Sequence, residues 1–212
     1  MTHTSITLLL ALALAGCDSR PPEGTLPPDA GVREQSPAVA SPAPAVEPQP
    51  TGWAPVFDKT LELQGITFVL HAQGGTLSIT PAGLEVDNQT VVRPIQGEVA
   101  DAVVADLDAD GSPEVYVFLQ SGPAARGSLA GYAANKRKSL SEIYLAPLDD
   151  DPRHGTGYGG HDTFTVLQDR VSRHFPIMRE DGTPSGTRRE IDYRLSAGEA
   201  GWILVAERVA DG

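Results

Sequence analysis

Short runs of alternating apolar and polar residues are the dominant pattern along most of this chain. They occupy 61–63 and 66–70 on either side of Gly65, and another run, 76–79, follows the turn signal Gly74-Gly75. Residues 115–119 (VYVFL) are instead apolar throughout, which is typical of a strand covered on both faces. Further short runs lie at 164–167, 191–195 and 202–205. No window of twelve or more residues keeps the apolar period of a helix, so the sequence predicts an all-β fold, an antiparallel β-sandwich.

The N-terminus carries a different pattern, one apolar run followed by a cysteine. The run, 6–15 (ITLLLALALA), would span about 15 Å as a helix, half of a bilayer's hydrocarbon core. It is too short to cross a membrane but suits the apolar region of a signal peptide. Leu14-Ala15-Gly16-Cys17 resembles a bacterial lipobox, although residues 1–5 contain no Lys or Arg. We therefore predict a signal peptide over 1–16 and lipidation of Cys17; the alternative is a plain secretory signal with an incidental cysteine.

Residues 17–51 are rich in proline and alanine. They hold nine of the chain's eighteen prolines and almost no large apolar side chain. Such a segment cannot bury enough surface to offset the entropy lost on ordering, so the sequence predicts a disordered linker, with a reach of about 100 Å when extended. The folded domain is expected over 52–212. Together these features predict a periplasm-facing envelope lipoprotein at the inner or outer membrane, which contacts the membrane only through the lipid on Cys17.

Charge and motif content exclude several classes of function. The formal net charge of −12 argues against nucleic acid as a partner, because neutralising phosphates requires a surplus of Lys and Arg. A single cysteine excludes a disulfide framework and a multi-cysteine zinc site. No nucleophile motif or phosphate-binding loop is present. His161 and Asp162 are adjacent, and neighbouring residues of a strand point to opposite faces, so this pair does not predict a catalytic dyad.

Six stretches follow one another along the domain: VYVF (115–118), GSL (127–129) with Tyr132 and Asn135, SLSEIYL (139–145), GYGGHDTF (157–164), RHFP (173–176) and GEAGW (198–202). In this order they resemble the periplasmic inhibitors of invertebrate-type lysozyme. The resemblance covers nearly the whole domain. It implies an all-β sandwich, a homodimer, and a non-enzymatic protein that occludes a lysozyme active site, with an invertebrate-type lysozyme as the expected partner.

The expected inhibitory loop follows the apolar run 115–119. A glycosidase cleft presents two carboxylates, so a protein that blocks it needs hydroxyl, amide or cationic donors on a stiff loop. The interval 115–141 contains no acidic residue but includes four basic ones, Arg126 and the triplet 136–138 (KRK). The loop residues predicted to bind the lysozyme are Ser121, Gly122, Arg126, Ser128 and Tyr132. The basic triplet is either part of this interface or a solvated hairpin tip.

One position in this loop departs from the family it resembles. The family carries a Ser-Gly-x-Tyr motif before Gly-Ser-Leu, and in an ungapped alignment this chain has Arg126 in place of the tyrosine. An arginine can form a bidentate bond with a carboxylate, which a tyrosine cannot. Inhibition could therefore continue through different chemistry, be directed at another lysozyme, or be lost.

An acidic stretch before the apolar run has the spacing of a short calcium loop. Residues 106–114 (DLDADGSPE) place Asp106, Asp108, Asp110 and Glu114 around a glycine at the sixth position. An EF-hand would need a glutamate at the twelfth position, which is Val117. The stretch is either an acidic β-turn or a weak Ca²⁺ site, and no other cofactor is predicted. If it binds Ca²⁺, the alternative function is a non-catalytic, calcium-dependent binding module of the envelope.

Overall fold

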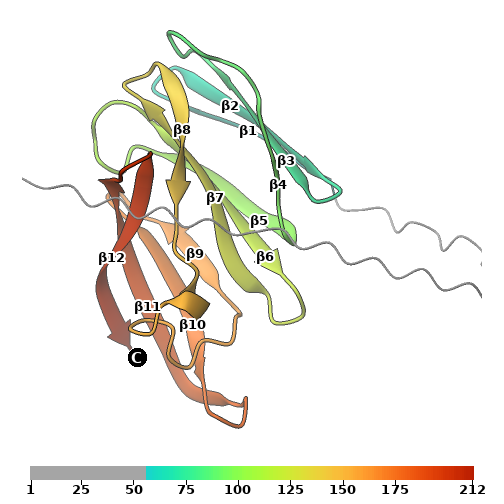
Figure 1. Cartoon of the computed structure of the whole chain (residues 1–212), viewed down its shortest axis with the longest axis vertical. Helices are drawn as coiled ribbons and strands as arrows, with labels where there is room; N and C mark the ends of the chain where they lie inside the picture. The colour runs from blue at the N-terminus through green and yellow to red at the C-terminus, as the bar shows by residue number, and fades with distance from the viewer. Residues whose placement is uncertain (1–55) are drawn as a thin grey trace, which may run out of the picture. The chain divides into compact units, whose positions relative to one another are not determined.

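The structure is a computed structural model that describes residues 56–212, which form twelve strands in two sheets (Figure 1). The predicted signal peptide, Cys17 and the linker lie outside the described residues. The first sheet has the order β1-β2-β3-β4, and all of its pairs are antiparallel. Its strands are β1 (Phe57–Leu63), β2 (Ile66–Gln73), β3 (Thr76–Ala82) and β4 (Val91–Pro94).

The second sheet has eight strands in the order β5-β6-β7-β8-β12-β11-β10-β9. They are β5 (Glu98–Ala105), β6 (Glu114–Ser121), β7 (Arg126–Asn135), β8 (Ser139–Tyr144), β9 (Thr163–Val166), β10 (Val171–Met178), β11 (Pro184–Ala197) and β12 (Trp202–Asp211). Neighbouring strands are antiparallel except at the centre, where Trp202 and Ile203 of β12 pair in parallel with Ile143 and Tyr144 of β8. A single 3-10 turn, η1 (Leu148–Asp150), follows β8.

Two hydrophobic cores lie on opposite faces of β6. Val115, Val117 and Leu119 point into the first core, which also contains buried residues of β2, β3 and β7. Tyr116 and Phe118 point into the second core, which is shared with β10, β11 and β12. In Figure 1, accordingly, the blue-green sheet lies on one side of β5–β7 and the orange-to-red strands lie on the other. The strand predicted to be covered on both faces is therefore the centre of the domain.

The eight-stranded sheet folds over on itself around the second core. Phe118 of β6 stacks on Phe164 of β9, with ring centroids 4.8 Å apart, although these strands are far from each other in the strand order. The domain thus has three layers: the first sheet, β5–β8 and β9–β12. The predicted all-β sandwich is confirmed, as is each strand expected from an apolar pattern. No helix among the described residues is long and apolar enough to cross a membrane.

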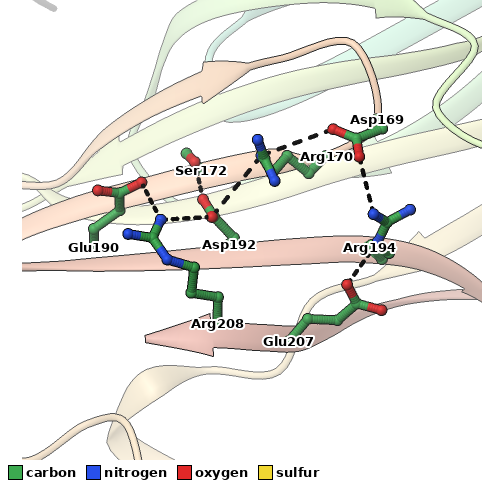
Figure 2. A network of polar contacts seen from close by, with 8 residues as sticks. All are labelled: Asp169, Arg170, Ser172, Glu190, Asp192, Arg194, Glu207 and Arg208. Atoms are coloured by element: carbon green, nitrogen blue, oxygen red, sulfur yellow. Dashed lines mark hydrogen bonds and ion pairs between the residues drawn. The ribbon is translucent and has the colours of Figure 1, made fainter. Parts of the chain in front are cut away.

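Charged side chains cover the outer face of β10–β12 (Figure 2). Arg208 lies between Glu190 and Asp192, at 3.3 and 3.1 Å, and Arg194 lies between Asp169 and Glu207, at 3.0 and 2.5 Å. Asp192 is buried; burial alone would raise its pKa, but the Ser172 hydroxyl and nearby arginines lower it. Since opposite charges alternate here, we interpret this surface as a solvated face; its exposed ion pairs contribute about 0–1 kcal/mol each.

Candidate functional site

The predicted inhibitory segment forms a tight hairpin turn between β6 and β7. Ser121 is the last residue of β6 and pairs with Arg126, the first residue of β7. Gly122 has a φ of 66° and Ala125 a φ of 44°, and the Ala125 N–H donates to the Gly122 carbonyl at 3.0 Å. The left-handed conformation suits glycine and costs free energy at an alanine, so this turn needs support from its surroundings. We call residues 121–126 the β6–β7 turn.

That support comes from the loop before β9. The His161 N–H donates to the Ala124 carbonyl at 2.6 Å, and the Asp162 N–H donates to the Ala125 carbonyl at 3.4 Å. A Cβ atom on Gly160 would lie 2.2 Å from the Ala124 oxygen, and Gly160 has a φ of 94°. Only glycine fits there, because any side chain would push the two segments apart. The β6–β7 turn is therefore held by backbone contacts along one side.

A buried ion pair lies directly beneath the turn. Asp162 and Arg173 are 1% and 2% exposed, and Arg173 Nε donates to Asp162 Oδ1 at 2.7 Å. Asp162 Oδ2 accepts the Gly127 N–H and the Tyr158 hydroxyl, both at 2.6 Å. Arg173 Nη2 donates to the Gly127 carbonyl and to the Tyr158 hydroxyl, both at 2.9 Å. The pair thus fixes both backbone polar groups of Gly127, one residue after the turn.

The protonation states in this network suit these roles. Burial alone would lower the pKa of Arg173, but the hydrogen bond and the charge of Asp162 raise it overall. Burial, together with the hydrogen bond to Asp162, raises the pKa of Tyr158 to about 12, so its hydroxyl remains a donor at neutral pH. Arg173 also lies 5.1 Å from the Tyr158 ring centroid and 5.2 Å from that of Phe164. We call Tyr158, Asp162 and Arg173 the buried triad.

Arg126 presents a cation at the base of the turn. Its side chain is 43% exposed, and Nη1 donates to both carboxylate oxygens of Asp149, at 2.8 and 2.7 Å. That hydrogen bond is the main cause that raises the pKa of Arg126. The guanidinium also lies 5.1 Å from the Tyr158 ring centroid. An adjoining hollow of about 320 Å³ is lined by residues that include Ser121, Arg126, Ser128, Asp149 and Tyr158. This hollow, with Arg126 at its wall, can receive an anionic group from a partner.

The structure separates the other predicted site residues from the turn. Ser128 is exposed on β7, while Tyr132, four residues further along β7, is only 7% exposed and packs in the first core. The expectation of one exposed loop that carries all five residues is therefore corrected: Ser121, Gly122 and Arg126 form the turn, and Tyr132 is inside. The residues after Arg126 form a strand because both β6 and β8 pair with them.

The basic residues likewise do not form one patch. β7 is ten residues long, about 30 Å, and it carries Arg126 at one end and the triplet 136–138 beyond the other. The triplet is the tip of the β7–β8 hairpin, where Lys136 and Arg137 have φ values of 46° and 59°. Of the two alternatives for the triplet, the hairpin tip is the one found. The candidate interface is therefore the end of β7 at the β6–β7 turn, which carries Ser121, Gly122 and Arg126.

Several residues of this site were missed by sequence reasoning. Tyr158, Asp162 and Arg173 lie within the stretches GYGGHDTF and RHFP, which were quoted as resemblances but given no role. Asp149 lies on η1 and had no signal at all. A signal in the sequence did exist for Asp162, because an acidic residue between a glycine-rich stretch and an apolar strand is a candidate for a buried turn contact. His161, its neighbour, is exposed, but both residues lie in the loop before β9 and His161 has a φ of 59°, so the expected alternation along a strand does not apply to this pair.

The acidic loop 106–114 brings three carboxylates together. Oxygen atoms of Asp106, Asp108 and Glu114 lie within 4.8 Å of one another. Asp106 accepts the N–H groups of Asp110 and Gly111, both at 3.1 Å, and Asp110 accepts the Ser112 N–H at 2.7 Å. The loop is therefore an acidic turn closed by side-chain to backbone bonds, as one of the two alternatives predicted. Its three convergent carboxylates are also the ligand type that Ca²⁺ prefers.

Glu114 is the buried member of this group. It is 2% exposed, and its Oε2 accepts the Leu107 N–H at 2.9 Å. Burial raises its pKa to about 8; the Leu107 N–H opposes this shift, and the charges of Asp108, Asp106 and Asp110 add to it. A cation bound here would reverse this shift, since a positive charge stabilises the ionised carboxylate.

This raised pKa predicts that stability decreases with rising pH. The folded protein holds the Glu114 proton more tightly than the unfolded chain, so the stabilisation is complete below about pH 4.5 and is lost as pH rises to about 8. Glu114→Gln keeps the shape of the neutral form and cannot ionise. With a chelator present, we expect the melting temperature of Glu114→Gln minus that of the parent protein to increase as the pH rises from 5 to 8. A difference independent of pH would contradict this assignment.

Comparison of the chain with protein-family models, with curated proteins and with solved structures finds no match in any of the three. The resemblance to the lysozyme inhibitors, based on the six motifs, therefore stays a prediction.

Proposed function

We propose that this chain is a lipid-anchored inhibitor of a lysozyme, most directly of the invertebrate type, and that it is not an enzyme. The β6–β7 turn would enter the active-site cleft, with Arg126 facing its carboxylates. The observation that carries the proposal is the contact between Arg126 and Asp149. Both carboxylate oxygens of Asp149 lie within 2.8 Å of one guanidinium nitrogen, so Arg126 already binds a carboxylate in the free protein, and a carboxylate of the cleft would take the place of Asp149.

Stiffness of the turn supports the same role. Binding costs less free energy when the inserted segment is already ordered, because little conformational entropy is lost on association. Here the turn is fixed by the backbone bonds to His161 and Asp162 and by the buried triad. Ser121 adds a hydroxyl at the start of the turn, although that hydroxyl also contacts the Arg126 carbonyl at 3.4 Å.

The charge of the chain suits a basic enzyme. A protein with a formal net charge of −12 attracts a cationic lysozyme over long distances, and the local cation then meets the acids of the cleft. Long-range attraction is screened by salt, with a Debye length of about 8 Å at physiological ionic strength. Salt should therefore slow association more than it speeds dissociation.

The proposal places the inhibitor in the bacterial envelope. Lipidation at Cys17 would hold the chain at the inner or outer membrane, and the linker 17–51 would let the domain reach into the periplasm. The family likeness also suggests a homodimer.

The test is a titration in a cell-wall lysis assay. Residues 17–212 carrying Cys17→Ser would be added to invertebrate-type, chicken-type and goose-type lysozymes. Stoichiometric inhibition of one class is expected, with nanomolar affinity, about −12 kcal/mol. If none of the three is inhibited, the lysozyme proposal is wrong.

A second candidate function is a calcium-dependent binding module of the envelope. It is favoured by the convergence of Asp106, Asp108 and Glu114 within 4.8 Å. If these carboxylates hold Ca²⁺ with a Kd of about 10⁻⁴ M, 10 mM Ca²⁺ would stabilise the fold by about 2.7 kcal/mol. The melting temperature would then rise by several degrees relative to chelator, and Asp108→Asn would reduce the rise. Equal melting in Ca²⁺ and chelator would exclude this candidate, while the inhibitor proposal requires no such shift.

A further inference from the structure

A second hollow lies at the opposite end of β7 from the candidate interface. Its volume is about 320 Å³, within the usual range for small-ligand sites. It is formed where the acidic loop, the β7–β8 hairpin and the first residue of β12 meet. Its lining residues are Asp110, Asn135, Lys136, Lys138, Ser139 and Trp202. The proposed lysozyme contact uses none of these residues.

An aromatic ring of fixed orientation forms part of this hollow. The indole N–H of Trp202 donates to Asn135 Oδ1 at 2.7 Å, and the Asn135 amide in turn donates to the Ser141 hydroxyl. Trp202 is half-buried and packs against the second core, so its ring cannot swing away. A rigid, partly exposed indole is a suitable surface for the apolar face of a sugar ring, because it loses little entropy on binding.

Two ammonium groups stand at the same hollow without a partner. The chain has only three lysines, and two of them, Lys136 and Lys138, line this site. Both are exposed, and neither forms an ion pair within residues 56–212. The third, Lys59, is paired with Asp101 at 2.7 Å. Because Lys136 and Lys138 are unpaired, the hollow is electrostatically complementary to an anionic ligand, although the protein as a whole is acidic.

The hairpin that carries the lysines is held in place. Between them, Arg137 turns back toward the body of the domain and donates to the carbonyls of Gly111 and Gln64, at 3.2 and 2.9 Å. The Glu85 N–H also donates to the Arg137 carbonyl at 2.8 Å. The positions from which Lys136 and Lys138 project are therefore fixed relative to Trp202 and Asp110.

We infer that this hollow binds a sugar that carries a carboxylate, such as an acidic amino sugar of a glycan. The pyranose ring would lie on Trp202, and the carboxylate would contact Lys136 and Lys138. The Asp110 carboxylate and the Asn135 amide oxygen would accept hydrogen bonds from sugar hydroxyls. Asp110 disfavours a ligand with several negative charges, and this selects a single carboxylate over a polyanion.

The experiment compares two sugars that differ by one lactyl carboxylate, N-acetylmuramic acid and N-acetylglucosamine. The protein is residues 17–212 with Cys17→Ser and Trp53→Phe, which leaves Trp202 as the only fluorescent tryptophan. N-acetylmuramic acid should change Trp202 fluorescence saturably, with a Kd at least tenfold below that of N-acetylglucosamine. Lys136→Gln/Lys138→Gln should remove this preference and leave the melting temperature unchanged.

A matched control removes two positive charges elsewhere. Arg153 and Arg188 are exposed and form no ion pair within the described part of the chain, so Arg153→Gln/Arg188→Gln should keep the preference. The inference is overturned if the two sugars bind equally or if the lysine variant keeps the preference. Competition by inorganic phosphate at the same concentration would also overturn it, because the hollow would then be a general anion site. None of these results depends on lysozyme inhibition.

Discussion

Asp162→Ala is expected to lower the free energy of unfolding by about 3–5 kcal/mol, the range measured when one partner of a buried ion pair is removed. The change would leave Arg173, which is 2% exposed, without its carboxylate. It would also leave the Gly127 N–H and the Tyr158 hydroxyl without their acceptor. Urea unfolding at neutral pH measures the effect, provided that the denaturant slope of the parent is kept.

Two further variants make this result specific. Asp169→Ala removes an exposed carboxylate that contacts Arg194 at 3.0 Å, and it should cost at most about 1 kcal/mol. Asp162→Leu/Arg173→Met removes both charges and should recover part of the loss, because no unpaired charge remains buried. If Asp162→Ala costs no more than Asp169→Ala, the pair does not hold the turn. Hydrogen exchange at the Gly127 amide should also become faster in Asp162→Ala, because that N–H donates to Asp162.

The strands could be predicted where large apolar side chains mark them. β6 is the clearest example, because VYVFL carries apolar residues toward both cores. β7 was interpreted as a loop, because its sequence RGSLAGYAAN is rich in glycine, serine and alanine. The small residues leave room for other parts of the domain: a Cβ on Gly127 would lie 2.7 Å from Phe164 of β9, across the second core, and a Cβ on Gly131 would lie 3.1 Å from Ile143 of the adjacent β8. Propensity along one segment cannot reveal such a constraint, because it arises from the neighbouring layers.

The site could be predicted only where it is local in sequence. Ser121, Gly122 and Arg126 do lie together, since a hairpin turn keeps sequence neighbours close. The sequence leaves open whether the triplet 136–138 belongs to the same surface as Arg126, because only the structure shows that a strand carries the two to opposite ends. The buried triad joins residues up to fifteen positions apart, and Arg126 meets Asp149 across twenty-three. Such contacts depend on how the sheet folds over, which no local pattern encodes.

Arg126→Ala is expected to weaken lysozyme inhibition by at least about 30-fold. Truncating one partner of a charge pair that is buried in an interface costs about 2–5 kcal/mol, and each 1.4 kcal/mol is a factor of ten in Kd. Because Arg126 is 43% exposed in the free protein, its loss should change the melting temperature little. Arg126→Lys should recover only part of the affinity, since an ammonium cannot bind both oxygens of a carboxylate in the same way. The measurement is the inhibition constant against the lysozyme class that the parent inhibits.

A variant of Asp149 distinguishes whether Arg126 binds the lysozyme directly or has only a structural role. In the free protein its carboxylate occupies the guanidinium that the lysozyme would use, so the two carboxylates compete. Asp149→Asn should therefore tighten inhibition by up to about fivefold, because an exposed pair is worth at most about 1 kcal/mol. If Asp149 only held Arg126 in position, the same variant would weaken inhibition. Arg188→Ala, which removes an exposed charge from β11, should leave the constant unchanged. Unchanged inhibition by Arg126→Ala would show that the turn binds without its cation.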